Sequence, residues 1–512
     1  MQMQPLKSNA GRASTSTVKF VDPPTKGWNA RDDLSAMDKD EAIVLENLVP
    51  SDTGIFLRPG YTSWVTGLGS DIRSLMEYNS AAASKLFAAT GTAIYDVSTT
   101  GVVGAAVVTP LTNGHWQHVM FSTAGGTFLV IANGSDTVRN YDGAVWTAPA
   151  ITGVTPANLI GVTSHMSRLW FIEENTMKAW YLPTLSIAGA ATSIDFGGIS
   201  KLGGKLIAMA SWTRDSGAGI EDLAVFVTSA GEVHIYGGTD PAAAATWKRV
   251  GTYKISEPLG RRCMVKVGGD VGIITTQGVI PLTGVLSRAE SAQGKVAITD
   301  KIRNDFSSAY NANTSSKMWQ CIEYPVAKLL MLNAPIVDGV SARQFVMNAN
   351  TGAWCKFTNL NANVFSLKGT EMYFGGLNGT VYKIGGTTDA GVAIDGLSVS
   401  AFQNFGTAGT KSFRRIRPQF FGPSGYRPSI ALKLDYSDEF AIYTAASFNA
   451  PGVAWDTPDW DASAWASPAQ SSALWQGITG EGFVAAVVVK LSSVETMTYN
   501  GAKILYETGD QL

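Results

Sequence analysis

A pattern of short β-hairpins recurs along this chain and limits what it can fold into. The plainest copy spans residues 371–386, where two runs of aromatic and β-branched residues flank Leu377, Asn378 and Gly379. An Asn-Gly pair supplies the positive φ that a tight hairpin turn needs. Turns of this kind stand near residues 91, 134, 175, 231, 278 and 378.

The spacing of these turns predicts an all-β fold, a β-propeller of six or seven blades. Successive turns are 41 to 56 residues apart, and the last interval of 100 is about two periods. A four-strand unit that repeats every 40 to 50 residues is typical of a propeller blade. A chance run of hairpins in another all-β protein is the alternative. The first strands of the blades are expected at residues 72–78, 116–121, 159–163, 206–212, 264–267, 319–324 and 364–367.

Composition supports short strands joined by many turns. The 512 residues include 54 glycines, and only 16% are charged, below the usual quarter. The net charge of −2 implies no general affinity for polyanions. Cys263, Cys321 and Cys355 are widely separated and odd in number, so we expect buried free thiols. No apolar segment after Met1 suggests a secretory signal, and no apolar run is long enough to predict stable membrane insertion.

Three segments are expected from the sequence. Residues 1–65 form an N-terminal arm and a distinctive segment, residues 66–386 form the propeller, and residues 387–512 form a β-rich C-terminal domain. Within the first segment, a short helical turn is expected near residues 38–47, before a strand that ends at Arg58, Pro59 and Gly60. Residues 288–311 are the other place where a helix is expected.

The distinctive segment resembles the N-terminal hallmark of the tail nozzle, or tail tubular protein B, family of short-tailed bacteriophages. In that family a loop led by glycine precedes an Asn-rich segment, a further glycine and Arg-Pro-Gly, and a propeller follows. The matching positions are Gly27, Asn29, Asn47, Gly54, Arg58, Pro59 and Gly60. The family's usual Gln/Pro-rich opening is absent here, where residues 28–33 stand in its place, and the chain is short for the larger members.

The resemblance implies a structural virion protein without enzymatic activity, cofactor or metal. It implies a homo-oligomer, a ring of six copies, that extends the channel below the portal and adaptor proteins and contacts tail fibres. Double-stranded DNA would be retained by the ring and pass through it during ejection without sequence-specific contacts. The protein would be made in the host cytoplasm and reside in the phage tail.

Two groups of charged residues in the C-terminal segment are candidate functional sites. Arg414, Arg415 and Arg417 could contact phosphates or a neighbouring subunit, and alternation along a strand would place Arg414 on the opposite face from the other two. Residues 428–512 hold three basic and ten acidic side chains. Acidic side chains lining a conduit would repel DNA phosphates and let DNA slide. The candidate lining residues are Asp435, Asp438, Glu439, Asp456, Asp459 and Asp461.

The alternative function is a glycan-binding or glycan-degrading propeller that faces a receptor. The tryptophans around Asp456, Asp459 and Asp461 could belong to a sugar site, although turn aspartates and packed tryptophans explain them more simply. A third possibility is a cellular scaffold propeller that binds protein partners through its loops. His115 and His118 would face opposite sides of a strand, so they do not predict a shared metal.

Overall fold

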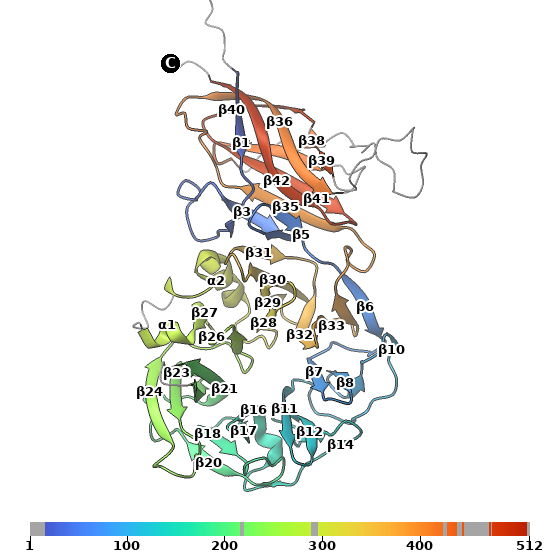
Figure 1. The fold of residues 1–512 in the computed structure, drawn as a ribbon, viewed down its shortest axis with the longest axis vertical. Coiled ribbons are helices and arrows are strands. Elements are labelled where there is room, and N and C mark those ends of the chain that lie inside the picture. The colour runs from blue at the N-terminus through green and yellow to red at the C-terminus, as the bar shows by residue number, and fades with distance from the viewer. Residues whose placement is uncertain are drawn as a thin grey trace, which may run out of the picture. The chain divides into compact units, whose positions relative to one another are not determined.

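The chain folds into two compact units that are mostly β-strand (Figure 1). The computed structural model describes residues 16–215, 220–287, 295–422, 428–437, 443–444, 470–472 and 474–508. One unit is residues 59–392, and the other combines residues 1–58 with 393–512. These bounds differ from the three segments expected from the sequence, because strands near the N-terminus pair with strands near the C-terminus.

Residues 59–392 form a β-propeller, which in the described chain has seven blades. Each blade is an antiparallel sheet whose strands follow one another in the chain, except that the last blade recruits an early strand. Blade one consists of β7 (Ser74–Asn79), β8 (Ser84–Ala89) and β9 (Ile94–Asp96). Blade two consists of β11 (Gln117–Thr123), β12 (Gly126–Ala132), β13 (Arg139–Tyr141) and β14 (Trp146–Thr147). Blade three consists of β16 (Leu159–His165), β17 (Arg168–Glu173), β18 (Lys178–Tyr181) and β20 (Thr192–Asp195).

The remaining blades complete the ring. Blade four consists of β21 (Leu206–Asp215), β22 (Ile220–Thr228), β23 (Glu232–Gly237) and β24 (Lys248–Lys254). Blade five consists of β25 (Met264–Val267), β26 (Asp270–Thr275) and β27 (Gly278–Pro281). Blade six consists of β28 (Gln320–Tyr324), β29 (Leu329–Val337), β30 (Ser341–Asn348) and β31 (Trp354–Phe357). Blade seven is β32 (Ala362–Lys368), β33 (Glu371–Gly376), β34 (Val381–Ile384) and the early strand β6 (Tyr61–Thr66).

Contacts between the first strands of successive blades close the ring. Each first strand contacts the first strand of the next blade, and β32 of blade seven contacts β7 of blade one. Blade seven is completed by β6, whose Val65 is the antiparallel partner of Val381. The seven expected first strands and the turns of the repeat are therefore confirmed.

Apolar side chains on facing blades hold the ring together. One buried cluster joins Met76 and Phe87 of blade one to Leu129 and Ile131 of blade two. Similar clusters link blades two and three, three and four, and seven and one. Strand residues alternate between the two faces of a sheet, so a blade that packs against a neighbour on each side buries apolar side chains on both faces.

Blade six fills the double-length interval in the repeat, because the turn between its strands β29 and β30 lies at residues 338–340, and an insertion precedes that blade. Between blades five and six the chain forms α1 (Leu282–Ser287), a 3-10 turn at Asp300–Ile302 and α2 (Arg303–Ala312). The helix expected at residues 288–311 is thus confirmed in its later part, and residues 288–294 lie outside the described chain. None of the described helices is long and apolar enough to cross a membrane.

The other unit is built from both ends of the chain as two β-sheets. One sheet contains β4 (Leu48–Pro50), β5 (Ile55–Leu57), β42 (Thr498–Thr508), β36 (Lys411–Gly422) and β39 (Gln470–Ser472), with β1 (Ser16–Val21) on β42 and β40 (Gln476–Gly482) on β36. The second contains β2 (Gly27–Trp28), β3 (Glu41–Glu46), β35 (Ile394–Ser400), β41 (Ala485–Ser493), β37 (Ser429–Leu434) and β38 (Tyr443–Thr444). Gly396 lets the sheets pack closely, because a Cβ there would meet Leu57 and Leu48.

The helical turn expected at residues 38–47 is wrong. Residues Glu41–Glu46 form strand β3, which pairs with β35. Ile43 and Val44 are β-branched, and Ala42 and Leu45 are buried in the sheet. Tertiary pairing with a strand some 350 residues away decides the conformation here, rather than local periodicity.

Candidate functional site

A central channel passes between the first strands of the propeller. Within the described chain it encloses a cavity of about 190 Å³. Every blade contributes to its lining: Leu75, His118, Thr163, Met209, Met264, Cys321 and Phe365. Ligands commonly bind in such concave sites, so the channel and its mouth are the candidate site of this unit.

Two adjacent arginines cross the channel. Arg261 and Arg262 precede β25, and their side chains reach blades one to three on the far side of the ring. Arg262 Nη2 donates to the carbonyl of Arg73 at 2.8 Å and to Ser74 Oγ at 2.9 Å. Arg261 Nη1 donates to the carbonyl of Asn133 at 2.8 Å. These bonds are charge-assisted, so they tie distant blades more strongly than neutral hydrogen bonds would.

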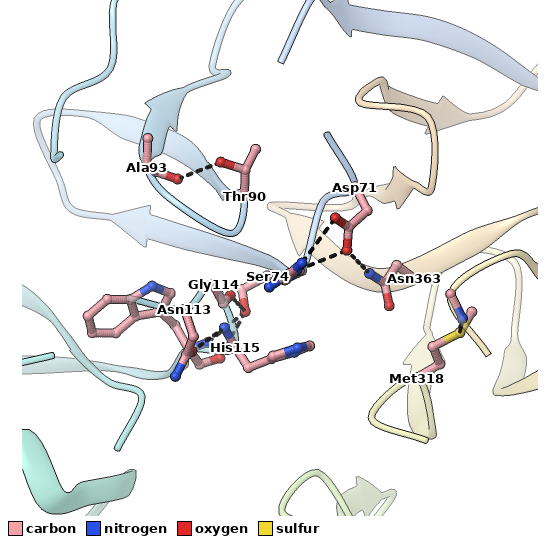
Figure 2. A network of polar contacts seen from close by, with 12 residues as sticks. Asp71, Ser74, Thr90, Ala93, Asn113, Gly114, His115, Met318 and Asn363 are labelled. Atoms are coloured by element: carbon pink, nitrogen blue, oxygen red, sulfur yellow. Dashed lines mark hydrogen bonds and ion pairs between the residues drawn. The ribbon is translucent and has the colours of Figure 1, made fainter. Parts of the chain in front are cut away.

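Ser74, one of the two acceptors of Arg262, belongs to a dense network of hydrogen bonds (Figure 2). Ser74 Oγ donates to the carbonyl of Gly114 at 2.8 Å and accepts from the amide of Trp116 at 2.8 Å. Gly114 is required, because a Cβ there would lie 2.0 Å from the carbonyl oxygen of Thr90. The connection thus fixes blade one against the start of blade two.

A second part of the network joins blade seven to blade one. Asp71 pairs with Arg73, whose Nε lies 2.9 Å from its carboxylate, and accepts a hydrogen bond from Asn363 Nδ2 at 3.4 Å. Figure 2 shows the contact of Asn363 with the Asp71 carboxylate. The positive charge of Arg73 is therefore matched locally, whereas Arg262 has no hydrogen-bonded carboxylate among the residues that the structure describes.

The channel histidines are neutral at physiological pH. Burial, together with Arg262 and other nearby cations, lowers the pKa of His115 to about 3. Burial and Arg262 lower the pKa of His118 to about 4, although its ring remains accessible from the channel. Burial also lowers the pKa of Arg262 to about 10, which leaves it charged at pH 7. His115 lies before β11 and His118 within it, and the two rings line different cavities.

The hallmark residues of the β-sheet unit have structural roles. Arg58 is only 2% exposed, and its Nε donates to Asn47 Oδ1 at 2.8 Å. Asn47 adopts a positive φ of 56° and donates from Nδ2 to the carbonyl of Asp395. This pair joins the segment before the propeller to the segment after it.

The earlier hallmark positions organise the loop before β3. Asn29 Nδ2 donates to Asp32 at 2.8 Å and to Glu41 at 2.7 Å, while its Oδ1 accepts from the amides of Arg31 and Asp32. Gly27 has a positive φ of 78°. A Cβ on Gly54 would lie 2.5 Å from Asn500 Oδ1.

The last hallmark positions mark the chain's entry into the propeller. Arg58 ends one unit and Pro59 begins the other. The Gly60 amide donates to the carbonyl of Gly386 at 3.0 Å, and a Cβ on Gly60 would lie 2.0 Å from the carbonyl oxygen of Thr388. Only glycine fits this close approach of two backbones.

The expected placement of the three arginines on β36 is partly wrong. A register shift between Phe413 and Arg415 marks a β-bulge, so Arg414 and Arg415 are both exposed. A bulge inserts one residue and breaks strict alternation. Arg414 lies 3.1 Å from Glu507, and Arg417 is partly buried.

Among the candidate acidic residues, the structure describes Asp435 alone. It has a positive φ, and its Oδ1 accepts from the amides of Phe483 at 2.7 Å and Val484 at 3.0 Å. Asp435 therefore holds the turn before β41. Asp438, Glu439, Asp456, Asp459 and Asp461 lie outside the described residues.

The arginine crosslink was hardly predictable from the sequence. The one available signal was the pair Arg261-Arg262, which precedes the strand expected at residues 264–267 in a chain with few charges. The three cysteines are free and buried, as expected, and burial raises the pKa of Cys263 and Cys321 to about 12. Within the described residues, no group of three possible metal ligands lies together.

The strand pairing and the closed ring of contacts define the chain as an all-β protein with a β-propeller. No protein-family model matches the sequence, and no curated protein matches it.

Among solved structures, the chain is similar to the WD40 β-propeller domain of Doa1, with 10% identity, a TM-score of 0.38, and coverage of 63% of this chain and 96% of that one. It is also similar to BBS1N in complex with ARL6DN, with 11% identity, a TM-score of 0.37, and coverage of 64% and 97%. A glycoside hydrolase family 43 arabinoxylan arabinofuranohydrolase from Bacillus subtilis has 12% identity, a TM-score of 0.24, and coverage of 90% and 94%. These TM-scores are too low to support any inference about function.

Proposed function

We propose that this chain is a structural component of a short-tailed phage tail, a nozzle or hub protein. Its copies form a ring that extends the DNA channel below the portal and adaptor, retains packaged DNA and passes it during ejection. The observation that carries the proposal is the placement of the hallmark residues. Asn47, Arg58 and Gly60 hold the segment that leads into an inserted propeller, in the order that the family resemblance implies.

The connectivity of the chain suits a mechanical role. The chain passes between its two units twice, at residues 58–59 and 392–393. Each unit is also closed by pairing of strands that are distant in sequence, β6 with β34 in one and β1 with β42 in the other. A load applied to one unit is therefore transmitted to the other through two chain connections rather than one.

Charge in the C-terminal segment supports passage of DNA without binding. Residues 428–512 carry three basic and ten acidic side chains. Asp435 is exposed and fixed by two backbone amides, so it is a candidate for the channel lining. Negative side chains repel phosphates, and an absence of tight contacts lets DNA move.

Assembly on phage connectors tests the proposal. The purified chain is mixed with portal–adaptor rings and followed by light scattering and negative-stain imaging. We expect a ring of six copies, formed either in solution or only on the connector. A monomer or trimer that ignores connectors would contradict the proposal.

A matched pair of charge reversals tests whether β36 forms the ring interface. R414E/R415E changes two exposed arginines of this strand, and K248E/R249E changes two exposed cations of β24 as a control. We expect the first variant to weaken assembly and the second to leave it unchanged. Equal assembly of both variants would remove the interface assignment for β36.

A glycan-binding function at a receptor is the second candidate, and one pocket favours it. Tyr61, Phe374 and Tyr382 line a cavity of about 380 Å³ together with three asparagines. Phe374 and Tyr382 are stacked with ring centroids 4.8 Å apart. Aromatic faces with a few amides suit a sugar, which offers both C–H groups and hydroxyls. Binding of bacterial polysaccharide by the wild type, and its loss in Y382A, would favour this function over the tail nozzle.

A further inference from the structure

A second cavity opens beside the channel at the arginine crosslink. It has a volume of about 260 Å³ and lies within the propeller unit. Three segments enclose it: the lead into β25 at residues 259–262, the loop before β28 at residues 314–317, and the start of blade two with His115 and Gln117. We call it the mouth pocket.

The charges around the mouth pocket are predominantly positive. Arg261, Arg262 and Lys317 line it, and none of its described lining residues is a carboxylate. Of the acids nearby, Asp71 pairs with Arg73 and Asp338 accepts a hydrogen bond from Ser316. Glu174 does not line the pocket, although its charge acts on Arg261. Lys317 is exposed and has no ion-pair partner within the described chain.

Two buried donors at the pocket have no acceptor among the described protein atoms. They are Nη1 of Arg262 and Nε2 of Gln117, and both residues line the pocket and the channel cavity. A buried donor without a partner costs about 1–3 kcal/mol, so such groups are usually satisfied by something. The exposed side chains of Thr314 and Ser315 add hydroxyl groups at the rim. What the pocket lacks is an acceptor that carries negative charge.

We propose that the mouth pocket binds a phosphate group, either free phosphate or a terminal phosphate monoester. Three cations suit a dianion, whereas one carboxylate would neutralise only a third of their charge. Arginine also presents paired N–H donors that match a phosphate oxygen edge. This inference rests on the propeller alone and does not depend on the proposed role in a phage tail.

Lys317 and Arg261 are the residues to vary, and Arg262 is left unchanged because it holds blade one. Arg261 also bonds to the carbonyl of Asn133, so it is changed only to lysine, which keeps a charged donor. K317Q removes a charge from an exposed side chain, and R261K keeps the charge while removing the guanidinium fork. K266Q is the matched control, since Lys266 is an exposed lysine of β25 outside the pocket lining.

Calorimetric titration of the full chain with sodium phosphate, at constant ionic strength, tests the proposal. We expect saturable binding to the wild type and to K266Q, with affinity about tenfold weaker in K317Q and in R261K, which corresponds to about 1.4 kcal/mol each. Acetate at the same concentration should not bind. Absence of binding, or equal binding to all four proteins, would overturn the proposal.

A second titration separates the two sources of the phosphate. A short oligonucleotide with a 5′ phosphate is compared with the same oligonucleotide without it. Tighter binding of the phosphorylated form than of inorganic phosphate would assign the pocket to a terminal monoester, and binding of inorganic phosphate alone would assign it to the free ion. Equal binding of both oligonucleotides, undiminished in K317Q, would count against the pocket as the site.

Discussion

His165 shows how burial of one ring makes the propeller sensitive to pH. It is 2% exposed, and its Nδ1 lies 2.9 Å from Ser211 Oγ, near the indoles of Trp170 and Trp247. Burial lowers its pKa from 6.5 to about 4. Between these two values the unfolded chain binds a proton that the folded chain does not.

This difference predicts the direction of the pH effect. The contribution of neutral His165 to stability is fully present above pH 6.5 and is lost as the pH falls from 6.5 toward 4, below which it changes no further. We expect the urea midpoint of the wild type to fall over this range by more than that of His165→Asn, whose amide can replace Nδ1 toward Ser211. Carboxylates common to both proteins cancel in the difference. Identical slopes would show that the ring is protonated equally in both states.

At the scale of elements, the close approach of residue 60 to residues 386–388 secures the closing blade. A Cβ on Gly60 would lie 2.0 Å from the Thr388 carbonyl oxygen, whereas a Cβ on Gly104 would meet nothing within 4 Å. Gly60→Ala should therefore destabilise the propeller by about 2 kcal/mol or more, as overpacking against backbone does. Gly104→Ala should leave it unchanged or stabilise it by up to about 1 kcal/mol.

The two variants are compared by urea unfolding monitored by tryptophan fluorescence. If Gly60→Ala and Gly104→Ala unfold at the same midpoint, the two backbones are not held as closely as the structure indicates. A lower midpoint for Gly60→Ala alone would locate the ring closure at this crossing.

The sequence predicts elements well where a single hairpin carries the signal. All seven first strands and six of the blade turns could be located, because turns such as Asn-Gly and Ala-Gly between β-branched runs are local features. Strand β3 was missed because its partner, β35, lies far away in the sequence. The bulge at Arg414 was missed because a register shift depends on the partner strands β40 and β42, and not on β36 itself.

The candidate site was less predictable than the fold. Its residues come from separate parts of the chain, so that Arg262 and Ser74 are 188 positions apart. No local pattern connects a pair of arginines before blade five with a serine of blade one. Only the order of blades around a closed ring brings them together.

At the scale of the whole molecule, the two units are expected to lose structure independently. The first strand, β1, is mostly exposed and pairs along its length with β42, from Ser16 with Glu507 to Val21 with Ala502. Removing residues 1–21 should leave that edge of β42 unpaired. We expect faster hydrogen exchange of peptides covering residues 502–507 and unchanged exchange in blade two, at residues 129–132.

Mass spectrometry of deuterium uptake measures both regions in one sample. The peptide at residues 129–132 serves as the internal control, because it lies in the buried core of the propeller. Equal acceleration in both regions would show that the two units unfold as one cooperative body.

The closure of blade seven by β6 has a consequence for biosynthesis. Residue 65 leaves the ribosome long before residue 381, its partner in the sheet. At translation rates of roughly 5–20 residues per second, the early strand waits on the order of 15–60 s for its partner to be made. During that delay β6 has an unpaired edge that could join another nascent chain, so the yield of native protein should depend on how far apart ribosomes are spaced on the messenger RNA.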